Sequence, residues 1–185
     1  MIPIASLWLP ILLSAVGVFI ASSIVHMVLK YHQGDYAKLA GEDNVLAAMR
    51  EAGVKPGSYY FPNCVDPKDL AEPAMQEKFK AGPVGFMTVI PSGVPTMGKQ
   101  LGLWFAYSVL VGGCVAYLAS RTLDAGAPYL KVFQVVGTIA FLAYGFAHLS
   151  DSIWRGQSWT SAFKHLLDAL IYGCVTAGFF GWLWP

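Results

Sequence analysis

The sequence predicts an all-α integral membrane protein with four transmembrane helices and a small α+β polar insertion between helices 1 and 2. The first observation is four long stretches without Asp, Glu, Lys or Arg: Met1–Leu29, Leu101–Ser120, Val132–Ser150 and Ala169–Pro185. Each is about long enough to cross a hydrocarbon core of ~30 Å at ~1.5 Å per helical residue. The second is composition, with 56% hydrophobic residues, 12% charged residues and a mean hydropathy of +0.52. Third, eight of twelve basic and eight of eleven acidic residues lie between Lys30 and Lys99.

These boundaries divide the chain into five parts. The transmembrane helices are predicted at 1–29, 100–121, 130–151 and 161–184, and residues 30–99 form the polar, membrane-associated insertion. The first stretch lacks the basic start and the small-residue cleavage site of a signal peptide. It is therefore expected to remain as a span.

The flanking charges predict the orientation. With four crossings, the termini share a side with the turn 121–131, and residues 30–99 share the other side with the turn 151–164. Most basic residues near the spans are on the second side: Lys30, Lys38, Lys80, Lys99, Arg155 and Lys164. The positive-inside rule then places residues 30–99 in the cytoplasm and both termini outside.

Within the insertion, residues 42–52 have the pattern of an amphipathic helix that Gly53 ends. An extended stretch follows at 58–62, and residues 84–90 have the composition of a second strand. Pro73 divides the region between them into two helical pieces. The two apolar stretches are expected to pair as a small sheet, in a unit that has little core of its own.

Small residues at four-residue spacing indicate where helices pack. The second predicted span carries Gly112 and Ala116, and the fourth carries Gly173, Ala177 and Gly181. Such residues let helix backbones approach closely in lipid, where burial between helices gains no hydrophobic free energy. They serve either packing within the chain or self-association.

One constellation of polar residues has the composition of a functional site. His148 and Asp151 end the third span, and His165 and Asp168 begin the fourth, so two His-x-x-Asp pairs face each other across a turn. His26 reaches the same membrane face from the first span. Imidazoles and carboxylates bind divalent metals, two histidines can hold a haem, and histidine can relay protons near neutral pH.

A structural role for the same residues is the alternative. Asp151 precedes Arg155 by four residues and Lys164 precedes Asp168 by four, so each acid has an expected local salt-bridge partner. Ser22, one turn from His26, is the expected partner of that imidazole. In this interpretation the polar residues cap helix ends at the interface, and the protein has no cofactor.

The sequence favours a non-catalytic function. No phosphate loop, nucleophile elbow, His-Glu-x-x-His or Cys-x-x-Cys motif occurs, so no catalytic residue is predicted. The formal net charge of +1 gives no basic excess for nucleic acid. The leading hypothesis is a self-assembling structural component or an accessory subunit, with the lipid bilayer and a homo-oligomer or larger membrane complex as partners. The alternatives are a metal- or proton-handling protein and a small transporter or channel.

Two blocks of sequence carry a resemblance. Ser22-Ser23-Ile24-Val25-His26 with the following Asp35-Tyr36-Ala37-Lys38-Leu39, and the block from Gly82 through Phe86-Met87-Thr88 to Trp104-Phe105, resemble a group of small bacterial inner-membrane proteins of unknown function. The resemblance covers most of the chain. It implies a bacterial four-helix protein of the inner membrane, and it assigns no site residues.

Overall fold

The computed structural model describes residues 2–185, so Met1, the first residue of the predicted span 1–29, lies outside the described residues. The described chain is 66% helical and contains one two-stranded sheet. It divides into two compact units, one made of residues 2–35 with 96–185 and the other of Tyr36–Pro95. The first unit holds helices α1 (Trp8–Ser23), α4 (Gly98–Thr122), α5 (Tyr129–Gly145), α6 (Ala147–Arg155) and α7 (Trp159–Trp182).

Among the described residues, three helical segments are long and apolar enough to cross a membrane: Ile4–Val28, Gly98–Thr122 and Tyr129–Arg155. The first combines a 3-10 turn (Ile4–Leu7), α1 and a π-helical turn (Ile24–Val28), and the third combines α5 and α6. The region predicted as a fourth span folds as α7, whose 24 residues give it a similar length. Lys164, His165 and Asp168 reduce the hydropathy of α7.

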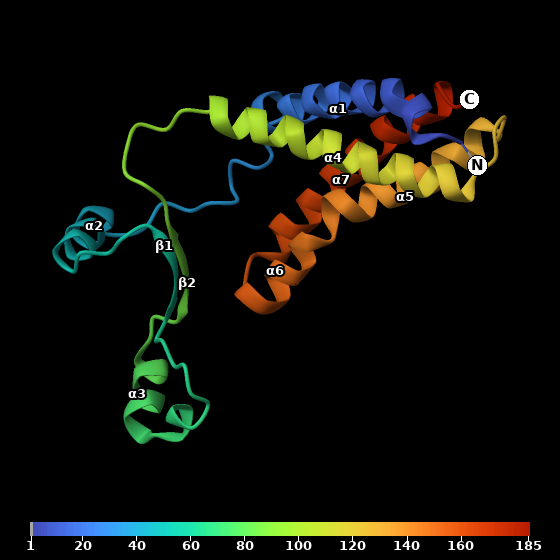
Figure 1. The fold of residues 1–185 in the computed structure, drawn as a ribbon. Helices are drawn as coiled ribbons and strands as arrows, with labels where there is room; N and C mark the ends of the chain where they lie inside the picture. The colour runs from blue at the N-terminus through green and yellow to red at the C-terminus, as the bar shows by residue number, and fades with distance from the viewer. Residues whose placement is uncertain (1) are drawn as a thin grey trace. The chain divides into compact units, whose positions relative to one another are not determined.

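The four long helices of the first unit pack side by side (Figure 1). α1 contacts α4 and α7, while α5 contacts α4 and makes its most extensive contact with α7. The shared interior is built from aliphatic, small and aromatic side chains. Its fully covered members include Leu7, Val18, Val115, Val132, Val136, Ala140, Ala177 and Phe180.

The small residues singled out in the sequence lie at helix contacts within this unit. A Cβ on Gly112 would be 3.3 Å from the Ile11 side chain of α1, and one on Gly181 would be 2.7 Å from the Tyr129 ring at the start of α5. A Cβ on Gly173 would be 3.1 Å from the Gly137 carbonyl of α5. Ala116 and Ala177 are completely buried. Packing inside one chain therefore accounts for both stripes.

Two irregularities shape the end of the unit where α1 finishes and α7 begins. The π-helical turn is closed by a hydrogen bond from the Leu29 amide to the Ile24 carbonyl, and Lys30 then adopts a left-handed backbone with φ of 55°. A residue other than glycine rarely adopts this conformation, and it reverses the chain here. The amides of Gln33 and Asp35 hydrogen-bond to the carbonyls of Lys30 and His32, which closes the turn.

The second unit, Tyr36–Pro95, confirms the helix predicted at 42–52 and the small sheet. α2 (Glu42–Glu51) begins with two acidic residues and has Arg50 in its last turn, as the helix dipole favours. β1 (Gly57–Phe61) pairs antiparallel with β2 (Gly85–Val89). Between the strands lie a 3-10 turn (Asp69–Ala71) and α3 (Pro73–Ala81), which starts on a proline. None of residues 36–95, all of which the structure describes, is buried.

Candidate metal centre

His32 occupies the centre of a polar cluster in the first unit. The turn after Lys30 directs its ring toward α7, where Nε2 lies 2.8 Å from Oδ2 of Asp168. Its other nitrogen, Nδ1, lies 2.6 Å from Oδ2 of Asp35. The ring is 13% exposed, and one carboxylate faces each of its nitrogens.

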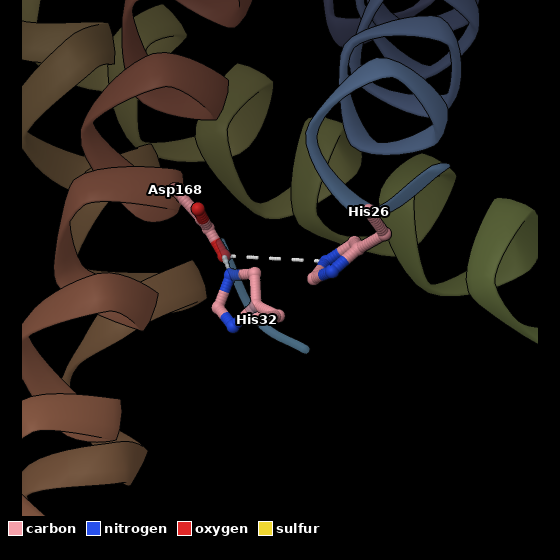
Figure 2. Close-up of side chains that lie close together, drawn as sticks. All are labelled: His26, His32 and Asp168. Carbon is pink, nitrogen blue, oxygen red and sulfur yellow. Dashed lines mark hydrogen bonds and ion pairs between the residues drawn. The ribbon is translucent and has the colours of Figure 1, made fainter. Parts of the chain in front are cut away.

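Asp168 is the most buried acidic residue of the cluster, with 2% of its surface exposed. Besides His32, its Oδ2 faces Nδ1 of His165 at 3.6 Å and Nε2 of His26 at 4.0 Å. The Tyr31 hydroxyl donates a hydrogen bond to the other oxygen, Oδ1. Figure 2 shows the His26 ring and the Asp168 carboxylate pointing toward each other, with the His32 ring beside the carboxylate. Three imidazoles from two segments of the chain thus converge on one carboxylate oxygen.

Asp35 forms an outer layer of the cluster. Its Oδ1 accepts a hydrogen bond of 2.6 Å from the Lys164 ammonium, while Oδ2 is occupied by His32. Burial alone would raise the pKa of Asp35, but the hydrogen bonds from Lys164 and His32 outweigh it and lower the pKa to about 2. Burial, together with the neighbouring Asp168, raises the pKa of the Tyr31 hydroxyl well above its ordinary value. Asp35 is therefore a carboxylate and Tyr31 a neutral donor at neutral pH.

The four histidines form a continuous series of neighbouring rings, in which His32, His165 and His148 are stacked and His26 is tilted against His32. The ring centroids of His26 and His32 are 4.7 Å apart, those of His32 and His165 are 4.9 Å apart, and those of His165 and His148 are 4.0 Å apart. His148 thus joins the cluster by stacking.

Two sets of potential ligand atoms fit a single ion. The atoms offered by His26, His32 and Asp168 lie within 4.8 Å of one another, and so do those offered by His32, Asp35 and His165. Four ligands arranged tetrahedrally at ~2.0–2.2 Å from a metal are about 3–4 Å apart, so modest movement of the rings would complete such a shell. Imidazole nitrogens mixed with a carboxylate suit Zn²⁺, Fe²⁺, Mn²⁺ or Cu²⁺ better than Ca²⁺ or Mg²⁺.

The structure differs from the sequence prediction at two polar pairs and agrees at one. Lys164 does not pair with Asp168 along α7, because its ammonium reaches Asp35 on another segment. Ser22 does not satisfy His26: its hydroxyl donates to the Phe19 carbonyl and accepts from Nε1 of Trp104. Asp151 forms the predicted pair with Arg155 at 3.5 Å, and among the described residues neither ligand set includes Asp151 or His148.

The candidate ligands predicted from the sequence did not include His32, Asp35 or Tyr31, which belong to the start of the predicted insertion 30–99; His32 was expected only at the same membrane face as the other histidines. The signal that could have indicated them is the spacing of His32 and Asp35, which form an i, i+3 pair like the two His-x-x-Asp pairs.

The fold and this site together define a class: a mostly helical protein with three helices suited to a membrane and a buried histidine–carboxylate cluster at one end of its helical unit. Comparison with protein-family models, with curated proteins and with solved structures gives no match.

Proposed function

We propose that this chain is a four-span bacterial inner-membrane protein that binds one divalent transition-metal ion at its histidine–carboxylate cluster. The observation that carries the proposal is the convergence of the His26, His32 and His165 nitrogens on Oδ2 of Asp168. A buried carboxylate is costly without a compensating cation or several hydrogen bonds. Asp168 has hydrogen bonds with Tyr31 and His32, and a metal ion at Oδ2 would compensate its charge more fully.

Each residue of the cluster then has a distinct task. His26, His32 and Asp168 are the ligands of the first set, and His165, whose Nδ1 lies 3.6 Å from Oδ2 of Asp168, would be the fourth ligand. Asp35 accepts the Nδ1 proton of His32, so the metal would bind Nε2, the nitrogen that faces Asp168. Lys164 in turn holds Asp35. The two carboxylates and one ammonium leave one negative charge when the imidazoles are neutral, which favours a cation.

Haem is less well supported than a bare ion. A porphyrin between two axial histidines separates their rings, whereas the His32 ring is in contact with those of His26 and His165, at centroid distances of 4.7 and 4.9 Å. Proton transfer through the doubly hydrogen-bonded His32 is the remaining alternative at this site, and metal analysis distinguishes it.

The membrane arrangement belongs to the same proposal. α7 runs alongside α1 and α5, and its most polar residue, Asp168, is buried within the unit. A helix of this length with its charge covered can cross a bilayer as a fourth span. The positive-inside rule places the cluster and residues 30–99 at the cytoplasmic face, with both termini outside.

The test is metal binding by the purified full-length chain. The protein is stripped with a chelator and titrated with Co²⁺, whose visible bands report coordination by nitrogen and oxygen. We expect one Co²⁺ per chain in the unmodified protein, loss of binding in His32→Gln and Asp168→Asn, and retention in Asp151→Asn, the control from the exposed pair with Arg155. Equal Co²⁺ binding by the unmodified protein and by Asp168→Asn would contradict the proposal.

A second function, an accessory or self-assembling subunit, is favoured by the Tyr36–Pro95 unit. This unit lacks a buried residue over its whole described length, so its stability calls for a contact with lipid or another chain. The mass of the protein extracted in a mild detergent tests this function. A complex of two or more chains supports it, and a monomer with no co-purifying chain argues against it.

A further inference from the structure

A half-open cavity adjoins the candidate metal centre on the side of His26, and Met27 and Met97 at its rim are 67% and 63% exposed. Its volume is about 270 Å³, and it lies between the end of the first helical segment and the start of α4. Its polar edge includes His26 and Gln100, and its apolar walls include Met27, Met97, Leu101 and Trp104. His26 therefore contributes to both the cluster around Asp168 and the wall of the cavity.

The backbone at this wall is unusual in a way that shapes the cavity. His26 and Met27 lie in the π-helical turn Ile24–Val28, which carries one more residue per turn than the α-helix before it. Such turns widen a helix locally and occur often at functional sites. Here the turn presents His26, whose side chain is 46% exposed, at the edge of the cavity while its Nε2 faces Asp168.

The walls specify the chemistry of an occupant. None of the described residues that line the cavity is acidic or basic apart from His26, so a charged molecule would lack a partner. Methionine thioethers and an indole make favourable contacts with flat rings. The indole N–H of Trp104 is already bonded to Ser22, which leaves its apolar ring to line the wall. His26 and Gln100 can hydrogen-bond to an oxygen on such a ring.

The position of the cavity indicates where the occupant comes from. Both of its walls belong to helical segments that are suited to cross a membrane, Ile4–Val28 and Gly98–Thr122. The volume is near the lower end for small-molecule sites, which corresponds to one ring without a long tail. A ring bound here can keep an attached tail in the surrounding lipid.

We infer that this cavity binds the head group of a lipid-soluble quinone or quinol, with a ring oxygen beside His26. This inference extends the proposed function, because the cavity shares His26 with the candidate metal centre.

A quinone photoprobe tests the inference. The full-length protein in nanodiscs is labelled with an azidoquinone, and the labelled peptides are identified by mass spectrometry. We expect labelling within residues 22–27 and 97–104 that decylubiquinone suppresses and 1-decanol does not. Labelling that both compounds suppress equally, or that falls elsewhere, overturns the inference, since it would indicate a general lipid groove.

A substitution and its control complete the test. Met97, which is 63% exposed, forms part of the apolar wall, and Met97→Arg is expected to reduce the labelling by about tenfold or more, because a bound ring would have to cover the new cation without pairing it. Val94→Arg is the control, since Val94 is 90% exposed and does not line the cavity. Both variants are expected to retain Co²⁺. Labelling unchanged in Met97→Arg overturns the inference. Specific labelling in a protein that binds no Co²⁺ would instead reject the metal and leave the cavity assignment standing.

Discussion

At the scale of single residues, the centre consists of two carboxylates with different surroundings. Asp168 is nearly inaccessible and has histidines as its ion-pair partners in the described chain. Asp35 is paired with a lysine. Since a lysine already compensates Asp35, a metal ion should prefer the Asp168 side of His32. Asp35 then acts by orienting the His32 ring.

This division of roles predicts that Asp35→Asn weakens metal binding without abolishing it. Asparagine cannot accept the Nδ1 proton as strongly, so the His32 ring is held less firmly and is a weaker ligand. Loss of such an outer partner typically costs about 10- to 100-fold in metal affinity. Co²⁺ titration measures the effect, with Asp43→Asn in α2 as the exposed control. Complete loss of binding would show that Asp35 is itself a ligand.

The lowered pKa of Asp35 predicts a pH dependence of stability in the metal-free protein. The folded pKa of about 2 is below the ordinary value of 3.8, so the stabilisation is fully present above the ordinary value and is lost as the pH falls through the folded pKa. We expect the unmodified protein to unfold at a higher temperature than Asp35→Asn at neutral pH. The difference should disappear between about pH 4 and pH 2. A difference that stays constant across that range would contradict the ion pair.

The sequence indicated that histidines from several spans lie at one end of the helices, but not the contacts of His32 and Asp35, because the two depend on different information. His148, His165 and Asp168 lie on helices whose ends follow from hydropathy, so their common level was predictable. His32 and Asp35 reach the site through a turn that begins at Lys30, where an uncommon left-handed backbone reverses the chain. The spacing along the chain likewise predicted a pair between Lys164 and Asp168, but in the fold Lys164 pairs with Asp35 on another segment.

At the scale of elements, Gly173 lies closer to the backbone of a neighbouring helix than Gly112, the other predicted packing glycine at which a Cβ would meet helix backbone. On α7, a Cβ at Gly173 would meet backbone atoms of α5, the Gly137 carbonyl at 3.1 Å and the Phe141 amide nitrogen at 3.3 Å. Backbone cannot rotate away as a side chain can. The closest approach of α5 and α7 therefore depends on the absence of a side chain at this position.

Gly173→Val is accordingly expected to destabilise the protein by about 1–3 kcal/mol, the usual cost of overpacking. Gly113→Val on α4 is the matched control, because a Cβ at Gly113 would find nothing within 4 Å and the β-branched side chain is the same. Thermal unfolding in one detergent compares the two variants. Equal stability of the two variants would mean that α5 and α7 can move apart at position 173 without a loss in the free energy of unfolding.

At the scale of the whole molecule, sequence patterns predicted the helices and the small sheet. These patterns are less informative on whether α7 crosses a membrane. Periodicity and proline positions are local, and they correctly indicated α2 and the pairing of β1 with β2. Lys164 and Asp168 reduce the hydropathy of α7. In the fold, however, Asp168 is buried, so its carboxylate is not on the outer surface of the helix. Hydropathy alone does not register that burial.

Contacts at the two ends of α7 fit the arrangement that the proposed fourth crossing requires. Near its start, Lys164 bonds to Asp35, which follows the first apolar segment. Beyond its end, Nε1 of Trp184 donates to the Asp124 carbonyl, and the Gly126 amide donates to the carbonyl of Pro185. α7 therefore connects the level at which α1 ends with the level of the loop between α4 and α5.

Cysteine labelling in bacterial cells tests this arrangement. With Cys64, Cys114 and Cys174 replaced by serine, single cysteines are introduced at Ala40, Ala125, Gln157 and Pro185. We expect a membrane-impermeant maleimide to label positions 125 and 185 in intact spheroplasts and positions 40 and 157 only after permeabilisation, because the basic flanks retain that face in the cytoplasm. Labelling of 125 and 185 from opposite sides would show that α7 does not cross. Labelling of positions 40 and 157 from opposite sides would place His32 and His165 at opposite membrane faces. The candidate metal centre could then not form.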